Sequence, residues 1–215
     1  MNPTAVRMTV AQTRILGNVE SVEFGCVPMW KRGLDLLCLL LLLPGYLPLM
    51  GIIAALIKIV SPGPVFFKQV RVGYRGQRFL CYKFRSMKKN TPNVATHLLQ
   101  NPSQYVLKIG GLLRKLSLDE LPNLINIIKG EMVFVGPRPA LYNQDDLMQL
   151  RVQAGVDRLK PGLTGWAQVN GRDEIEIEAK VAFEKEYLER QSFWFDLEII
   201  ALTFTKVLKS QGVKH

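Results

Sequence analysis

The longest hydrophobic feature of the chain is an uncharged run at positions 36–57, LLCLLLLLPGYLPLMGIIAALI. A helix of this length, rising about 1.5 Å per residue, would cross a hydrocarbon core of about 30 Å. Pro44, Gly45 and Pro48 interrupt the run near its middle, where each proline removes a helix hydrogen bond. Two alternatives therefore stay open: a helix that spans the membrane, or one that enters one leaflet, breaks and returns.

Basic residues flank this run on both sides. Lys31 and Arg32 precede it, and Lys58 and Lys68 follow it. A spanning helix usually shows a basic bias on one side only, whereas anionic lipid at the cytoplasmic face would attract both flanks of a re-entrant helix. The run begins too late and is too long for a cleavable signal peptide. The flanks thus favour the re-entrant alternative, while the length favours the spanning one.

Strand-like and helix-like periods alternate after the turn cluster at 61–64. Residues 65–70 and 79–85, around Gly73 and Gly76, are typical of a β-hairpin. The other expected elements are a loop at 88–103, a helix over 104–116, a helix over 121–128 closed by Gly130, a strand at 132–135, a rigid loop at 136–139, a helix over 142–158, a glycine-rich loop at 161–172, a charged helix over 173–192, and an amphipathic helix of interfacial composition over 193–209. This order indicates an α/β fold.

The charge of the chain is strongly uneven. Lys and Arg total 28 against 18 Asp and Glu, a net charge of +10 over 215 residues. From Leu36 to Leu118 there is no acidic residue, and the first carboxylates after this stretch are the adjacent pair Asp119-Glu120. Such a stretch is either a solvated basic face or a surface for an anionic partner, namely nucleic acid, anionic lipid or a phosphorylated substrate.

Few residues are available for soft-metal or triad chemistry. The chain has two histidines, His97 and His215, and three cysteines without metal-ligand spacing. This composition argues against a disulfide framework, fits a reducing compartment and leaves almost no residues for a histidine-built metal site or a Ser-His-Asp triad. A bound metal would therefore be a hard cation held by carboxylates and phosphates.

The Asp119-Glu120 pair has two interpretations. Ser117-Leu118-Asp119-Glu120 matches the Ser-x-x-Glu capping box, in which Ser117 caps the following helix and Glu120 reaches back to it. Pro122 sits late for that arrangement, because proline prefers the first turn of a helix. A helix that starts at Leu118 or Asp119 would instead expose both carboxylates at its N-terminus, where they could hold Mg²⁺ beside phosphate.

Two further segments carry candidate anion-binding groups. Arg138 stands between two prolines that restrict the backbone, and a fixed guanidinium suits bidentate phosphate binding; the alternative is a surface loop arginine. Residues 159–172 combine three glycines with Trp166, Lys160 and Arg172, which would suit a nucleotide site or a plain structural loop.

Several motifs in order resemble the bacterial sugar transferase family, the monotopic phosphoglycosyl transferases, in its small catalytic-core form. The resemblance covers about residues 31–212. The motifs are Lys31-Arg32-x-x-Asp35; Gly63-Pro64-Val65-Phe66-Phe67; Arg71-x-Gly73-x-x-Gly76; Lys83-Phe84-Arg85-Ser86-Met87; Arg114-Lys115-Leu116-Ser117-Leu118-Asp119-Glu120-Leu121-Pro122; Gly136-Pro137-Arg138-Pro139; and Lys160-Pro161-Gly162 through Arg172. The helix break of the family is typically Ser-Pro, whereas here Leu47 precedes Pro48.

The resemblance implies an enzyme that transfers a sugar-1-phosphate from a UDP-sugar to undecaprenyl phosphate and releases UMP. Asp119 would be the catalytic nucleophile and would form a phosphosugar-aspartyl intermediate, with Glu120 supporting a Mg²⁺ or Mn²⁺ ion at the pair. The residues expected to bind substrate are Lys83, Arg114, Arg138 and Arg172.

It also implies a re-entrant membrane helix broken at Pro48, on the cytoplasmic face of the bacterial inner membrane. We therefore expect an extension at 1–30, the membrane helix at 31–60 and a catalytic core at 61–215. The expected partners are the two substrates and anionic membrane lipid, with no nucleic acid; the oligomeric state is not predicted. A non-enzymatic, membrane-anchored basic protein would explain the charge but not the carboxylate pair.

Overall fold

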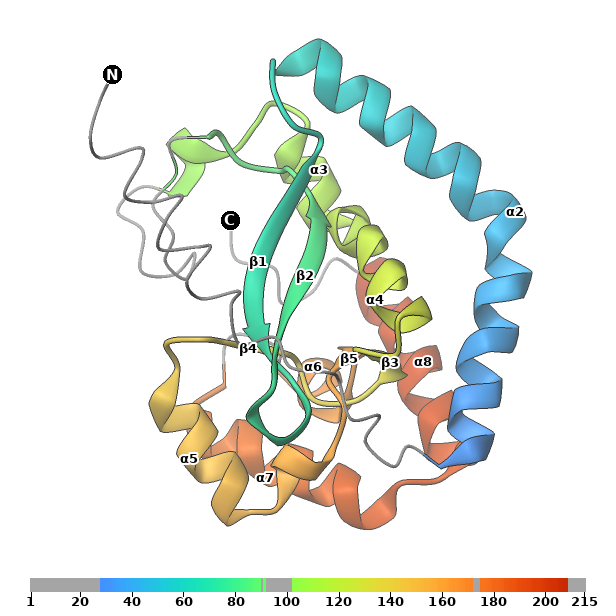
Figure 1. The fold of residues 1–215 in the computed structure, drawn as a ribbon, viewed down its shortest axis with the longest axis vertical. Coiled ribbons are helices and arrows are strands. Elements are labelled where there is room, and N and C mark those ends of the chain that lie inside the picture. Colours follow the sequence, from blue (N-terminus) through green and yellow to red (C-terminus); the bar gives the residue numbers. More distant parts are fainter. Residues whose placement is uncertain (1–27, 90, 92–101, 172–174, 209–215) are drawn as a thin grey trace.

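The computed structural model describes residues 28–89, 91, 102–171 and 175–208. Its fold mixes helices with two small sheets, as the α/β prediction has it (Figure 1). The apolar run forms α2 (Met29–Val60), a single helix that passes through both prolines. By length and composition this helix could cross a membrane, and most of its large hydrophobic side chains are exposed.

The structure does not contain two separate helices on either side of Pro48. Pro44 and Pro48 lie inside one continuous helix, and Figure 1 shows this helix curving as it follows the side of the molecule. A proline removes one backbone hydrogen bond, but the hydrogen bonds of the adjacent turns can maintain the helix, which then bends at the proline. The expected break is therefore observed as curvature, and a re-entrant hairpin remains a prediction.

Both ends of α2 nevertheless contact the same globular body. Near its start, Lys31 pairs with Asp196 and Asp35 accepts a hydrogen bond from Phe134 N at 3.2 Å. Near its end, Ile53 and Ile57 are buried in a hydrophobic cluster with residues that follow the helix. Figure 1 shows the same arrangement, with one end beside α8 and the other near α3. The curvature thus allows a long helix to dock at both of its ends.

The contacts at the start of α2 change the role expected for Lys31 and Arg32, the basic residues that precede the apolar run. Lys31 is only 2% exposed and forms an ion pair with Asp196. Arg32 donates hydrogen bonds to the carbonyls of Ile127 and Ile128. Lys31 therefore binds groups of the protein and does not face lipid, because a buried ammonium needs a fixed partner. Arg32 is half-buried, and its contact with anionic lipid remains a prediction.

The predicted hairpin is confirmed. β1 (Phe66–Val72) and β2 (Arg78–Phe84) pair antiparallel through the turn helix η1 (Tyr74–Gly76), and β4 (Ala140–Leu141) joins β1 to give the order β2-β1-β4. The turn requires positive φ at Arg75 (47°) and Gly76 (77°). The register opposes Lys83 to Phe67 and Arg71 to Leu141, which fixes the side chains that share a face.

The glycine-rich segment expected to be a loop is largely ordered structure. β3 (Val133–Val135) pairs in parallel with β5 (Gly162–Thr164), which leads into α6 (Trp166–Val169). A Cβ at Gly162 would lie 2.2 Å from Gly136 N, and one at Gly165 would lie 2.1 Å from Gly136 O. These glycines therefore allow two backbones to approach closely, which the interpretation as a loop missed.

Short helices replace the two regular helices expected over 104–128. They are η3 (Pro102–Tyr105), α3 (Gly110–Lys115), η4 (Leu118–Asn123) and α4 (Leu124–Ile128). Gly130, with φ of 77°, ends the last of them as predicted. One interruption covers residues 106–109, between η3 and α3. Another contains Ser117, whose φ of 55° is left-handed and cannot continue a helix.

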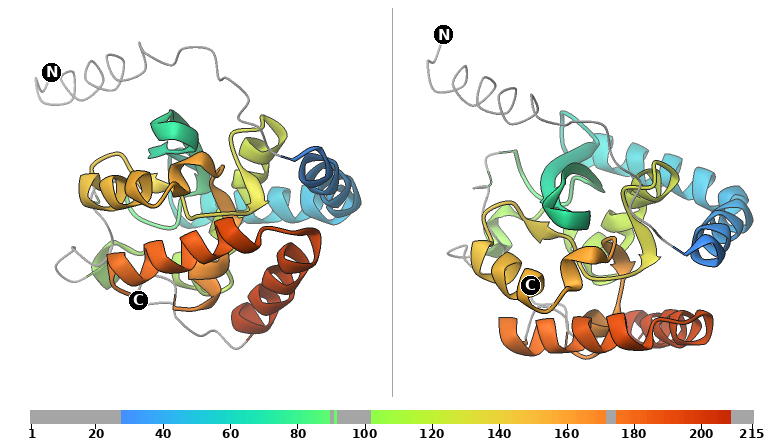
Figure 2. Two further views of the ribbon diagram at one scale, coloured as in Figure 1. Left: turned by 90° about the horizontal axis from the view of Figure 1, so that it is seen from below. Right: turned by 60° about the horizontal axis from the view of Figure 1, so that its bottom comes forward.

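The C-terminal part of the chain is helical, as expected. It contains α5 (Asp145–Gln153), η5 (Val156–Arg158), α7 (Ile177–Arg190) and α8 (Phe193–Leu208), and Figure 2 shows α7 and α8 along one side. Phe195 is buried against Tyr187 and Val135, whereas Phe193 and Trp194 are exposed and form an aromatic group with Trp30. An interfacial position of α8 remains a prediction, as does the division at residues 30 and 60.

Candidate active site

The helix η4 presents the Asp119-Glu120 pair, hereafter the dyad, in its first turn. Ser117 precedes it in the left-handed conformation, and its side chain makes no capping hydrogen bond. The Glu120 side chain points to other elements instead of back to Ser117. The capping-box interpretation is therefore wrong, because Ser117 does not cap η4 and the Glu120 carboxylate binds Lys83 and Arg138.

Glu120 lies between two cations from distant parts of the sequence. Its Oε1 accepts hydrogen bonds from Lys83 Nζ at 2.7 Å and from Arg138 Nη2 at 3.1 Å. The side chains of Glu120, Lys83 and Arg138 are 14%, 16% and 31% exposed, so the cluster is half-closed rather than sealed. The structure thus brings together three residues that the sequence analysis had assigned to the site.

Two asparagines of the η4–α4 segment attach it to the strand that carries Lys83. Asn126 is fully buried; it donates to Leu80 O at 2.7 Å and accepts from Tyr82 N at 3.2 Å. Asn123 accepts a hydrogen bond from Cys81 Sγ at 3.0 Å. The asparagine side chains thus provide hydrogen-bond partners for polar groups of β2. They hold η4 and α4 against this strand, which fixes the separation between Lys83 and Glu120.

The backbone of the loop that carries Arg138 is held by hydrogen bonds from two other arginines. Arg151 Nη2 donates to Arg138 O at 2.9 Å, and Arg71 Nη1 donates to Pro139 O at 3.0 Å. Arg151 itself forms a buried, two-bond ion pair with Glu184 of α7. Arg138 is therefore a component of the site and not a solvated loop arginine, and its backbone is fixed by residues from β1, α5 and α7.

The two carboxylates of the dyad have opposite electrostatic environments. Burial, then the neighbouring charge of Glu120, raises the pKa of Asp119 to about 6, against the opposing effect of Lys83 and Arg114. Burial by itself would also raise the pKa of Glu120, but Arg138 and Lys83 hold it well below its usual range. The two adjacent cations thus favour the ionised form of Glu120, while Asp119 is the more basic carboxylate of the pair.

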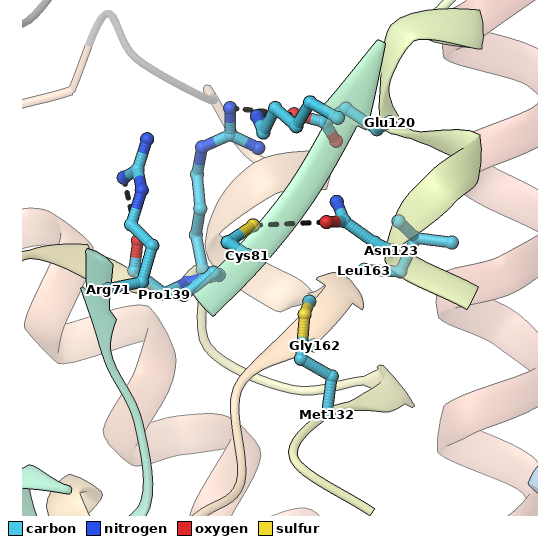
Figure 3. Close-up of a pocket in the computed structure, with 10 residues that line it drawn as sticks. Arg71, Cys81, Glu120, Asn123, Met132, Pro139, Gly162 and Leu163 are labelled. Atoms are coloured by element: carbon cyan, nitrogen blue, oxygen red, sulfur yellow. Dashed lines mark hydrogen bonds and ion pairs between the residues drawn. The ribbon is translucent and has the colours of Figure 1, made fainter. Parts of the chain in front are cut away.

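A small, partly open pocket lies beside this cluster, with a cavity volume of about 10 Å³, which is room for about one water molecule. Figure 3 shows Glu120 and Asn123 on one side of it, Arg71 and Pro139 on the other, and Met132 and Gly162 below. The described residues that line it are Arg71, Cys81, Lys83, Glu120, Asn123, Met132, Arg138, Pro139, Gly162 and Leu163. The wall combines three cations with an apolar floor, an arrangement suited to a phosphorylated ligand with a less polar part.

The dyad could hold only a particular kind of metal ion. Within the described ranges no three His, Cys, Asp or Glu side chains are grouped to form a metal site. One Glu120 oxygen already accepts from both Lys83 and Arg138. Two carboxylates fit Mg²⁺ or Mn²⁺ whose other ligands are phosphate oxygens and water, and do not fit an all-protein cage.

Two of the expected substrate-binding residues are not placed in the pocket. Arg114 lies on α3, where its charge lowers the pKa of Asp119, and its guanidinium donates to Met87 Sδ at 3.8 Å. Arg172 lies outside the described residues. The two residues of the dyad also differ in position. Glu120 lines the pocket, whereas Asp119 is not among the described residues that line it.

The sequence analysis did not assign Arg71 or Cys81 to the site. Both share a face of the β1–β2 hairpin with Lys83, because side chains alternate along a strand and the register pairs Gln69 with Cys81. The signal for them was therefore the strand period together with the register, which the sequence did not specify.

The chain also has extensive similarity to characterised and uncharacterised proteins. Residues 27–210 match the family model "Bacterial sugar transferase". The chain is 44% identical over 162 residues to the uncharacterized sugar transferase EpsL of Bacillus subtilis, covering 75% of this chain and 78% of that protein. It is 40% identical over 202 residues to the exopolysaccharide production protein ExoY of Rhizobium meliloti, covering 86% and 88%.

A third relative is longer. The UDP-glucose:undecaprenyl-phosphate glucose-1-phosphate transferase of Escherichia coli is 41% identical over 184 residues, which are 82% of this chain but only 39% of that enzyme. The family model covers most of the chain and includes the dyad, Lys83 and Arg138. The chain therefore belongs to the bacterial sugar transferase family.

Proposed function

We propose that this sugar transferase moves a sugar-1-phosphate from a UDP-sugar to undecaprenyl phosphate, with Asp119 as the nucleophile. The names of relatives support the acceptor, since five of them contain undecaprenyl phosphate and a sugar phosphotransferase or sugar-1-phosphate transferase activity. The observation that carries the proposal is the position of Asp119 in the first turn of η4, next to Glu120, whose carboxylate is hydrogen-bonded to both Lys83 and Arg138.

The proposed reaction proceeds in two displacements. A carboxylate oxygen of Asp119 attacks the β-phosphorus of the UDP-sugar; the new O–P bond forms while the bond to the α-phosphate oxygen breaks, and UMP leaves with the electron pair. An oxygen of the lipid phosphate then attacks the same phosphorus, the bond to Asp119 breaks, and the carboxylate is regenerated.

The chain's own residues would supply positioning and charge. Lys83 and Arg138 are held by Glu120 at the pocket, so that they are pre-organised for the diphosphate without a large rearrangement. Arg114 adds positive potential beside Asp119. Mg²⁺ bound by the dyad would supply further charge neutralisation of the phosphates; EDTA should therefore abolish turnover reversibly, and turnover that is indifferent to EDTA would contradict a metal requirement.

The experiment that tests the nucleophile is mass spectrometry of the acceptor-free enzyme. Incubation with a panel of UDP-sugars should release UMP and add a sugar phosphate to the peptide that contains Asp119. Asp119→Asn keeps the size of the side chain but removes the nucleophile, so both adduct and turnover should be lost. Full activity of Asp119→Asn, or an adduct on another residue, would disprove the assignment.

We further propose that α2 enters and leaves the membrane on its cytoplasmic side. This is supported by the contacts of both helix ends with one globular body and by the exposed leucines between them. Single cysteines at Met29 and Lys68, in a background without the native cysteines, should resist a membrane-impermeant thiol reagent in intact cells. Labelling of one site alone from outside would instead indicate a spanning helix.

A further inference from the structure

The helical segments η4 and α4 follow each other directly, so residues 118–128 form one short rod, hereafter the dyad rod. The dyad lies in its first turn. Leu124 N bonds to the carbonyls of Leu121 and Pro122, which joins the two helices without a gap. A displacement of the far end of this rod would therefore change the position of both carboxylates.

The far end of the dyad rod is held by the membrane helix. Arg32 of α2 donates through Nη1 to Ile127 O at 2.6 Å and through Nη2 to Ile128 O at 2.9 Å. Lys160 donates to Gly130 O at 2.7 Å just beyond it. Cations at the last carbonyls of a helix complement its dipole and satisfy acceptors that have no partner in the helix.

Arg32 stands on a part of α2 that is itself anchored. Lys31, its neighbour in sequence, is in the buried ion pair with Asp196, and Asp35, one turn further, binds Phe134 N. The second half of α2 lies at the other end of the dyad rod: Ile53 and Ile57 belong to a buried cluster against which Leu118 and Leu121, which flank the dyad, are packed. Figure 1 shows α4 lying between β2 and α2.

We propose that Arg32 is a positioning residue, through which the seating of the membrane helix sets the position of the dyad. This inference rests on the proposed role of the dyad in catalysis. It assigns to the arginine a mechanical function at two carbonyl oxygens of the core, in place of an interaction with lipid. Activity would then depend on how α2 sits in the bilayer, because α2 is hydrogen-bonded to one end of the dyad rod and shares a hydrophobic cluster with the other.

The test compares Arg32→Gln, Arg32→Lys and the control Lys58→Gln, all reconstituted in the same anionic phospholipid vesicles. Lys58 is an exposed cation at the other end of α2, so its replacement removes the same charge without touching the dyad rod. Two quantities are measured: the kcat and KM of UMP release with the UDP-sugar that the wild type uses best, and backbone hydrogen exchange.

We expect Arg32→Gln to lower kcat about 10- to 100-fold with an unchanged KM for the UDP-sugar, the pattern of a displaced catalytic group. Exchange should become faster in the peptide covering residues 118–130 and stay as in the wild type in α7. Arg32→Lys, which keeps the charge but loses the two-pronged contact, should fall in between. Lys58→Gln should match the wild type in both measurements.

A wild-type kcat and exchange rate in Arg32→Gln would overturn the proposal. Faster exchange spread equally over α5 and α7 would also overturn it, because that result indicates a general structural role. The hydrogen-exchange measurement does not depend on turnover, so it tests the link between α2 and the dyad rod even if Asp119→Asn were active and the proposed function were wrong.

Discussion

Two clusters in this molecule are built from the same kinds of groups but differ in their access to solvent. In the first, hereafter the sealed cluster, Asp196 accepts hydrogen bonds from Lys31 and from Tyr187 OH, the latter at 2.6 Å, with Asp35 close by. In the second, hereafter the open cluster, Glu120 accepts hydrogen bonds from Lys83 and Arg138, with Asp119 beside it.

Each cluster also contains one carboxylate of raised pKa. Burial raises the pKa of Asp35 to about 6, and burial together with Glu120 raises that of Asp119 to about 6. The side chains of Lys31 and Asp196 are only 3% and 2% exposed, whereas Arg138 is 31% exposed and lines a pocket. A carboxylate of raised pKa is therefore not sufficient to identify a functional site here. The sealed cluster and the open cluster differ in whether a ligand can reach them.

The largest effect should come from breaking the sealed cluster. Asp196→Asn leaves the Lys31 ammonium buried without its counter-charge, which should lower the free energy of unfolding by about 3–5 kcal/mol. Thermal and denaturant unfolding in detergent measure it. Glu198→Gln, an exposed change on the same helix, is the control and should have little effect. Equal stability of both variants would show that the sealed cluster does not hold α2.

A substitution in the open cluster should lower the rate of turnover more than it lowers the stability of the fold. Arg138→Lys keeps the charge but loses the planar fork, so turnover should fall by about tenfold or more while the unfolding midpoint changes little. Initial rates of UMP release measure this. Arg78→Lys, at the exposed end of β2, makes the same exchange away from the pocket and should keep normal rates. A loss of stability without loss of turnover in Arg138→Lys would reverse the contrast.

The smallest effect concerns the pH dependence of kcat/KM. It should depend on Asp119 and not on Asp35, the other carboxylate of raised pKa. Only the ionised form of Asp119 can attack, so kcat/KM should decrease as the pH falls through about 6, and higher Mg²⁺ should move this limb to lower pH. Asp35→Asn keeps an oxygen that can accept from Phe134 N and should leave the limb in place. A limb that moves in Asp35→Asn would mean that the sealed cluster titrates in catalysis.

The local parts of the fold were accessible from sequence because they follow from short-range chemistry. The strand period and the turn glycines predicted the β1–β2 hairpin, and Gly130 marked the end of a helix. The segment 161–172 was misjudged for the opposite reason. Its glycines serve contacts with Gly136, which lies more than twenty residues earlier, and no local pattern reports on such a partner.

The residue types of the candidate site were predictable, but their spatial relations were not. The ordered motifs indicated Asp119, Glu120, Lys83 and Arg138, and the structure groups the last three. The capping box was a valid local alternative at Ser117, and only the left-handed backbone of that residue excludes it. Arg71 was missed because its place depends on strand register, and Arg172 lies outside the described residues.

The sequence by itself determined the apolar run, the acid-free stretch that ends at the dyad, and a residue set suited to phosphate and a hard cation, because hydrophobicity, charge and ligand type are properties of side chains. Only the tertiary structure decided that Lys31 is sealed while Arg138 is open, and that Arg32 reaches two carbonyls of α4. Burial and hydrogen-bond partners are properties of pairs of segments, and here those pairs are separated by 18 to 165 positions along the chain.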